Sequence, residues 1–214
     1  MQPNVFANMD PALQLILLMA SLSLVPFIVV SMTSFLRYII VLSILKNALG
    51  TQQVPPSVVI VGMALTLTFY TMGPVFGEIY EEINPLLNKQ GNVVQIIDAG
   101  SQPLKNFMMR QTRQTDLAVF IEMSRDEMPA SPKELTLWEV APAYMISELQ
   151  TAFEIGFIIF IPFIVLDLVV ANILLALGMF MLSPTIISLP FKILIFVAVD
   201  GWALVLNGLV QSFN

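Results

Sequence analysis

Apolar residues of this chain gather in four long runs, which span residues 13–49, 58–76, 142–177 and 185–210. A polar stretch of about 65 residues separates the second run from the third. A helix needs about 20 apolar residues to cross a bilayer. The second and fourth runs therefore have the length of single spans, whereas the first and third are too long for one straight span.

Proline interrupts both of the long runs, at Pro26 in the first and at Pro162 in the third. Proline removes a backbone donor and clashes with the preceding turn of a helix. We therefore predict helix breaks at Pro26 and Pro162, and another at Gly73 and Pro74, where the second run ends. The predicted fold class is all-α, with helical hairpins of the integral-membrane type and long helices broken by proline.

The polar stretch holds most of the charged residues, and apolar positions recur in it at helical spacing. We interpret residues 1–214 as one unit, made of a first hairpin (1–76), a polar helical insert (77–141) and a second hairpin (142–214). The similar build of the two hairpins hints at internal duplication. Within the insert, Arg110, Arg113 and Asp116 recur every three residues, which is typical of a solvated helix face with minor ion pairing.

Composition places the chain in or beside a membrane. Its mean hydropathy is +0.84 and only 11% of its residues are charged, whereas a soluble domain has about 25%. Cysteine and histidine are absent, which excludes disulfides and thiolate metal sites and removes the commonest general base. The net charge of −6 argues against a nucleic-acid partner. We expect no catalytic residue, no metal and no cofactor.

The N-terminus and the polar insert indicate how the chain is placed in the membrane. The first 12 residues contain no lysine or arginine, and a signal peptide needs a positively charged start. We therefore expect the first run to be a retained segment. The acidity of the insert agrees with a periplasmic position, with both hairpin turns facing inward.

Several charged residues interrupt the apolar runs. A charge near the bilayer centre costs about 2.5–3.5 kcal/mol, so such residues face protein, water or an opposite charge. Besides Lys46, which closes the first run, they are Arg37, Glu148, Glu154, Asp167, Lys192 and Asp200. We expect Arg37, Glu154, Asp167 and Asp200 to be buried structural charges.

Glu148 and Lys192 lie at opposite ends of the second hairpin. About 30 helical residues separate them along the third run, or about 45 Å at 1.5 Å per residue. They are therefore not expected to meet within one straight hairpin, but they could pair between staggered subunits. The other interpretation is that each finds a local polar partner or extends to an interface.

Two other functions use the acidic residues. Glu154, Asp167 and Asp200 could relay protons in an ion-coupled secondary transporter, whose broken helices commonly flank a midplane site. Asp167 and Asp200 could also form an intramembrane aspartyl protease pair, but the chain has no GxGD-type motif.

The turn between the third and fourth runs, GMFMLSP at residues 178–184, is apolar and bounded by helix breakers. Methionine is flexible and repacks around varied partners. Several copies of Met179, Phe180 and Met181 around an axis would form a soft ring, which can exclude water and ions and still yield to a passing chain. The alternative is an ordinary buried turn.

Nearly the whole chain resembles the FliP/SctR family, the main subunit of the bacterial type III protein export gate. The stretches that carry the resemblance are residues 24–56, 103–120, 142–170, 174–184 and 189–202. Residues 109–120 and the C-terminal QSF resemble the flagellar branch of the family.

The resemblance implies a homo-oligomer of five copies that joins FliQ and FliR in a pore-forming assembly of the flagellar basal body. FlhA and FlhB would be neighbours, and unfolded flagellar proteins would pass through the pore across the inner membrane. Energy would come from the proton motive force and a separate ATPase. Apolar surface would be buried against neighbouring subunits or membrane lipid, and hydropathy does not separate these two.

The resemblance also assigns residues. The turn at Met179, Phe180 and Met181 matches the family's methionine gasket, except that its middle position is the bulkier and stiffer phenylalanine. Glu148 and Lys192 match positions that resemble a salt bridge between subunits.

Overall fold

The computed structural model describes residues 10–51, 54–88, 93–124 and 135–213. Helices make up 87% of these residues and none of them lies in a strand, which confirms the all-α prediction. In chain order the helices are α1 (Pro11–Met32), α2 (Phe35–Ala48), α3 (Ser57–Asn88), α4 (Val93–Gln111), α5 (Gln114–Ser124), α6 (Leu137–Ala176), α7 (Pro184–Ala198) and α8 (Gly201–Gln211).

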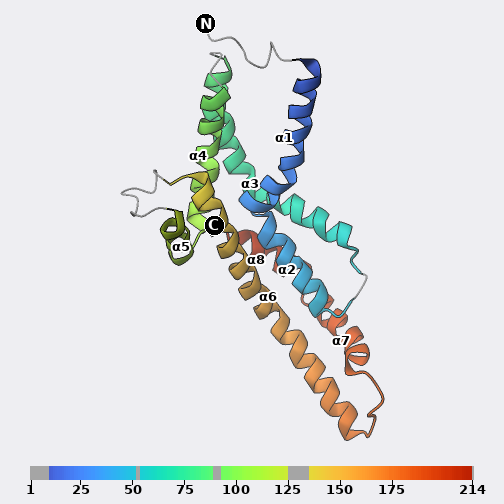
Figure 1. The fold of residues 1–214 in the computed structure, drawn as a ribbon. Helices are drawn as coiled ribbons and strands as arrows, with labels where there is room; N and C mark the ends of the chain where they lie inside the picture. The colour runs from blue at the N-terminus through green and yellow to red at the C-terminus, as the bar shows by residue number, and fades with distance from the viewer. Residues whose placement is uncertain (1–9, 52–53, 89–92, 125–134, 214) are drawn as a thin grey trace.

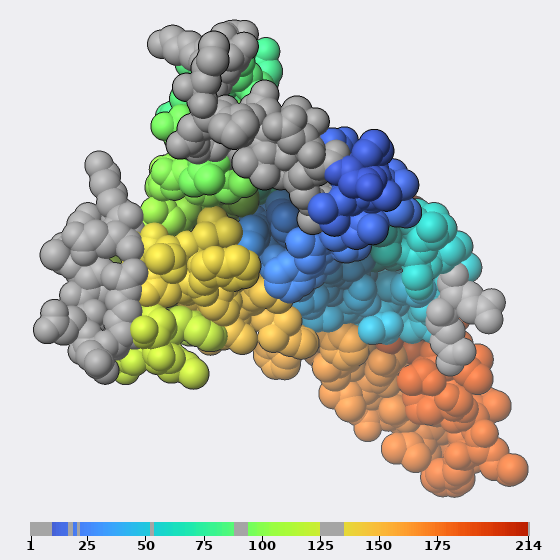
Figure 2. Space-filling view, turned by 45° about the horizontal axis from the view of Figure 1, so that its top comes forward, coloured from blue at the N-terminus to red at the C-terminus, as the bar shows by residue number. Residues whose placement is uncertain are grey.

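The 40-residue helix α6 runs from the body of the molecule to its far tip (Figure 1). Helix α2 packs along its middle, α4 and α5 lie beside its first half, and α7 folds back along its second half. The second half of α6 and α7 together form an arm that stands out from the body (Figures 1 and 2). By length and composition α3 and α6 could each cross a membrane, and the bent pairs α1 with α2 and α7 with α8 could each add one span.

The prolines do not break the helices where the sequence predicts. Helix α1 continues through Pro26, α3 through Pro74 and α6 through Pro162, so these three predictions are wrong. The chain bends instead by 70° between α1 and α2 and by 65° between α7 and α8. A proline costs a helix one backbone hydrogen bond and a local adjustment, which long apolar helices tolerate.

Hydroxyl side chains produce the first bend. Thr33 ends α1 in an extended conformation, with φ −125° and ψ 172°. Its Oγ1 donates to the carbonyl of Val29 and accepts from the N–H of Phe35, while its own carbonyl accepts from the Tyr144 hydroxyl at 2.9 Å. Such side chains compete with helical backbone bonds, so the run splits here, seven residues after Pro26.

A left-handed residue produces the second bend, which the sequence did not predict. Asp200 has φ 52° and ψ 49°, a conformation that aspartate tolerates better than most residues. The next residue, Gly201, lies so close to the Phe196 ring that a side chain would not fit. Phe196 also meets the Trp202 ring edge-on, with centroids 5.3 Å apart. The fourth run is therefore two helices rather than one.

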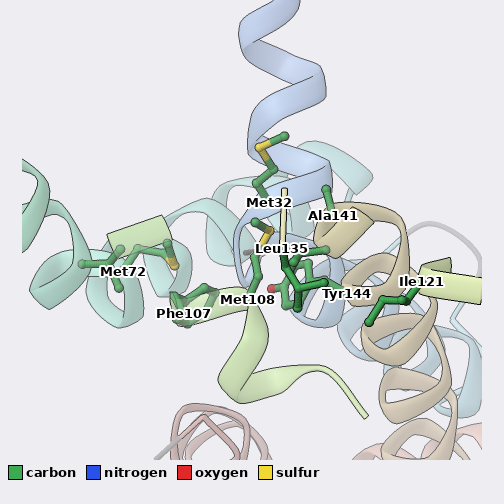
Figure 3. Packing of buried hydrophobic residues seen from close by; sticks show 10 residues of the cluster. Met32, Met72, Phe107, Met108, Ile121, Leu135, Ala141 and Tyr144 are labelled. Atoms are coloured by element: carbon green, nitrogen blue, oxygen red, sulfur yellow. The ribbon is translucent and has the colours of Figure 1, made fainter. Parts of the chain in front are cut away.

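The buried core is continuous across the polar insert. Figure 3 shows one cluster in which Met32 from α1, Met72 from α3, Met108 from α4 and Tyr144 from α6 come together. The boundaries drawn at residues 76/77 and 141/142 fall inside α3 and α6. The insert thus packs against both hairpins. Separately, α2 crosses α6 where Gly156 leaves room for Ile44.

Candidate functional site: an exposed apolar loop and the ion pairs behind it

The turn at the end of the arm has an ordered backbone. Gly178 adopts φ +75°, its N–H donates to the carbonyl of Leu175 at 3.1 Å, and the N–H of Met179 donates to the carbonyl of Leu174 at 2.9 Å. This pair of bonds is a Schellman motif, which ends a helix at a left-handed glycine. Ser183 and Pro184 then begin α7. Residues 178–183, which we call the apolar loop, are therefore fixed at both ends.

The loop points its apolar side chains outward. The exposed fractions are 44% for Met179, 76% for Phe180, 100% for Met181 and 42% for Leu182. The turn is therefore not buried within its own chain. Contiguous exposed apolar side chains usually mark a surface that another molecule covers. The structure brings the three candidate gasket residues together at one tip.

Helix α7 is fastened to the body by one narrow stripe, whose buried members are Ser188, Lys192 and Phe196. The Nζ of Lys192 donates to Oδ2 of Asp167 at 2.7 Å and to the carbonyl of Ala48 at 3.2 Å. Ser188 donates to the other carboxylate oxygen of Asp167 at 2.5 Å. Lys192 thus joins α7 both to α6 and to the last turn of α2.

A second buried cation lies at the opposite end of α2. Arg37 and Glu148 are 3% and 0% exposed. The Nε of Arg37 donates to Oε2 of Glu148 at 2.8 Å, and its Nη2 donates to Oε1 of Glu148 and to Gln111. Its Nη1 donates to the carbonyl of Ser212 at 2.8 Å and to the Ser212 hydroxyl at 2.9 Å. All five guanidinium N–H groups therefore have acceptors.

This group, which we call the arginine centre, joins four segments of the chain. Glu148 comes from α6, Gln111 ends α4, Ser212 follows α8 and Arg37 lies in the first turn of α2. The Phe213 ring lies over the guanidinium, 3.7 Å from ring centroid to Cζ. Such a contact between a cation and an aromatic ring adds to the ion pair. The centre fixes where α2, α4, α6 and α8 meet.

Glu148 and Lys192 do not pair with each other within the chain. Glu148 is neutralised by Arg37, and Lys192 is neutralised by Asp167. A contact between subunits is thus not needed to satisfy either charge, and the pairing across subunits stays a prediction that a single chain does not test. Sequence reasoning found neither of these partners within the chain, although Arg37 was the one cation deep in the first run.

Two of the four expected buried charges are exposed. Glu154 is 55% exposed and pairs with Arg113 at 2.7 Å, and Asp200 is exposed in the turn between α7 and α8. Both positions lie on outward faces of the single chain, so their burial in an assembly stays a prediction. Arg37 is buried and Asp167 is 28% exposed. Glu154 pairs with Arg113, Asp167 pairs with Lys192, and Asp200 bonds to neither of the other two acids. Within the described residues the three carboxylates therefore form no relay.

Part of the insert face that is predicted to be solvated is bonded to α6. Ser147 of α6 is fully buried, donates to Asp116 at 2.6 Å and accepts from the N–H of Arg113 at 3.0 Å. These bonds attach the turn between α4 and α5, and the first turn of α5, to α6. Among the residues that the structure describes, no group of three or more acidic side chains could hold a metal ion.

Comparison with known proteins settles the family. A family model described as the FliP family matches residues 18–209. The chain belongs to the FliP family. A relative from Bacillus subtilis, named flagellar biosynthetic protein FliP, is 46% identical and the match covers 98% of both chains. Relatives of that name from Caulobacter vibrioides and Pectobacterium carotovorum are 50% and 46% identical.

The matches extend over almost all of the structure. The Caulobacter and Pectobacterium proteins match 96% and 99% of this chain, which covers 77% and 82% of their lengths. The FliP family match includes the apolar loop, Lys192, Asp167 and three members of the arginine centre, and ends before Ser212. The resemblance seen in the sequence is therefore confirmed.

Proposed function

We propose that the chain is a pore-forming core subunit of the flagellar type III protein export gate. Its relatives are named as flagellar biosynthetic proteins, and its apolar helices suit a membrane. In this function it passes unfolded flagellar proteins across the bacterial inner membrane, with the polar insert on the periplasmic side. It acts in the basal body and not as an enzyme.

The observation that carries the proposal is the exposure of the apolar loop. Four neighbouring apolar side chains, with Met181 wholly exposed, lie on an ordered turn at the end of an arm. Such a surface usually marks a place that lipid, another protein or a passing chain covers. Arms from several copies around an axis would place Met179, Phe180 and Met181 in a ring that seals against ions.

The partners follow from this function. We propose about five copies of the chain, together with FliQ and FliR, with FlhB and FlhA as neighbours and membrane lipid around part of the assembly. The exposed apolar faces of α3 and α6 supply surface for such contacts. An ion-coupled carrier, the other candidate, needs a connected proton path, and Glu154, Asp167 and Asp200 do not form one within the described residues. A carrier would also purify as a small particle rather than as a ring.

Truncating the loop tests the seal. In the double variant Met179→Ala with Met181→Ala, we expect a several-fold rise in ion leakage across the inner membrane while flagellar proteins are still exported. Alanine leaves the ring too wide to exclude water, whereas an open ring does not hinder a passing chain. Conductance of cells or vesicles and the secreted amount of flagellar subunits are measured together.

A matched control keeps the number of lost methionines equal. Met19 and Met123 are 64% and 77% exposed and lie outside the loop, so Met19→Ala with Met123→Ala should leave conductance unchanged. Unaltered ion conductance in the loop variant, with normal assembly, would defeat the proposed seal.

A further inference from the structure

Helices α7 and α8, which we call the strap, are bonded to α2 at both ends of that helix. At the start of α2, Arg37 binds Ser212 and lies under Phe213, just beyond α8. At the end of α2, the carbonyl of Ala48 accepts from Lys192 of α7. The two contacts thus hold the strap at points that are 11 residues apart on α2, or about 16 Å.

The strap is bent between these two points. The 20 residues from Lys192 to Ser212 would extend about 30 Å as one straight helix, so a straight strap would overshoot the second fastening. The 65° bend at Asp200 shortens the distance between the two ends. Asp200 and Gly201 form the joint between α7 and α8, and the glycine packs under the Phe196 ring.

The two fastenings are unequal. The arginine centre has five donated hydrogen bonds, and its two charges are 3% and 0% exposed. Lys192 has two acceptors, and its counter-charge Asp167 is 28% exposed. Breaking a partly exposed ion pair costs less than breaking a fully buried one, because water solvates the charge that is left behind. The fastening nearer the apolar loop is therefore the weaker.

Helix α7 packs along α6 but buries few of its side chains. Its buried residues are Ser188, Lys192 and Phe196 only, and Ser188 binds the same Asp167 that Lys192 binds. Phe196 lies next to the joint and packs on Phe163, with ring centroids 6.4 Å apart. A change at the Lys192 contact therefore weakens the attachment of α7 on the side of the loop, whereas the end at the joint stays packed.

We propose that α7 is a lever, a rigid helix that rotates about the turn at Asp200 and Gly201 while α8 stays fixed to the arginine centre. The ion pair of Lys192 and Asp167, which we call the catch, holds α7 in the position seen here. This inference rests on the proposed function, because the lever moves the apolar loop that would seal the pore. Helix α7 has 15 residues, a length of about 22 Å, so a rotation of about 15° moves its far end by about 6 Å. A shift of that size widens a ring of side chains.

Spin-label distances test the lever on the full chain. The natural sequence has no cysteine, so introduced cysteines are unique labelling sites. Asn47→Cys at the end of α2 is paired with Ile186→Cys on α7 or with Leu204→Cys on α8; all three positions are exposed. The labelled chain is assembled with an excess of unlabelled copies in phospholipid vesicles, so that only distances within one chain are measured.

Releasing the catch should move one distance and not the other. In Lys192→Met, which keeps the length of the side chain, we expect the distance from residue 47 to 186 to lengthen or broaden by about 5 Å or more. The distance from 47 to 204 should stay unchanged. Asp167→Asn provides a second release if Lys192→Met does not accumulate. Glu154→Gln, at another position on α6, breaks the pair that Glu154 makes with Arg113. It is the matched control and should change neither distance.

The outcomes separate the lever from the pore. If both distances change together, the strap moves as one body and the joint is not a pivot. If neither changes, Lys192 and Asp167 are not a catch. If the loop double variant leaks ions but Lys192→Met changes no distance, the seal is supported and the lever is not. If Lys192→Met changes the distance but the loop double variant does not leak, the lever is supported and the seal is not.

Discussion

Arg37→Leu is expected to lower the free energy of unfolding by about 3–5 kcal/mol, because it leaves the Glu148 carboxylate buried without a counter-charge. Glu148 is 0% exposed and takes both of its charged bonds from Arg37. The same change leaves Ser212 and Gln111 without their donor. Denaturant unfolding of the purified chain in detergent, and its amount in membranes, measure the loss.

Companion variants identify the cause. Arg37→Lys keeps the charge but offers three donors in place of five, so it should recover only part of the stability. Removing both charges, in Arg37→Leu with Glu148→Leu, should recover part as well, since no buried charge is left alone. Glu154→Gln removes an exposed pair and should cost less than about 1 kcal/mol. If Arg37→Leu is no worse than Glu154→Gln, the arginine centre does not hold the fold together.

Phe213→Ala is expected to lower the free energy of unfolding by about 3 kcal/mol, the lower part of the range for removing a packed phenylalanine. The ring lies over Arg37 and packs beside Tyr38 and Phe107, with centroid distances of 5.3 and 6.2 Å. A loss of that size should lower the Tm by about 6–12 °C in a chain of this length. Thermal unfolding in detergent measures it.

The control for Phe213 is a phenylalanine of the same chain that lacks such contacts. Phe153 on α6 is 56% exposed, so Phe153→Ala should shift the Tm by little in the isolated chain. Phe213→Leu should recover part of the loss by refilling volume, without the contact to Arg37. Equal shifts for Phe213→Ala and Phe153→Ala would show that the segment after α8 contributes nothing to the fold.

The features that the sequence predicts well are those that local patterns decide. The apolar runs predict the helices, and Gly178 with Ser183 and Pro184 predicts the loop, because helix ends depend on a few neighbouring residues. The proline breaks were wrong for a related reason. Pro26 and Pro162 weaken a helix locally, but bonds from Thr33 and the left-handed Asp200 decide where the chain turns.

The ion pairs were out of reach of local patterns. Arg37 and Glu148 are 111 residues apart in sequence, and only the packing of α2 on α6 brings them together. Which acidic residue of α6 is buried depends on its face: Glu154 follows Glu148 by six residues, a rotation of about 240° on a continuous helix. A helix that is expected to break at Pro162 does not fix the rotation of the residues beyond the break. The sequence therefore could not separate the exposed Glu154 from the half-buried Asp167.

The central claim is that the apolar loops of several copies meet around a conduit, and cross-linking through Met181→Cys tests it most directly. In assembled complexes within native membranes, we predict that a short thiol cross-linker joins neighbouring copies through residue 181, while Met123→Cys, an exposed site on α5, gives no ladder. A Met181→Cys chain that remains monomeric under cross-linking, and whose thiol reacts instead with a probe dissolved in the lipid, would contradict the account.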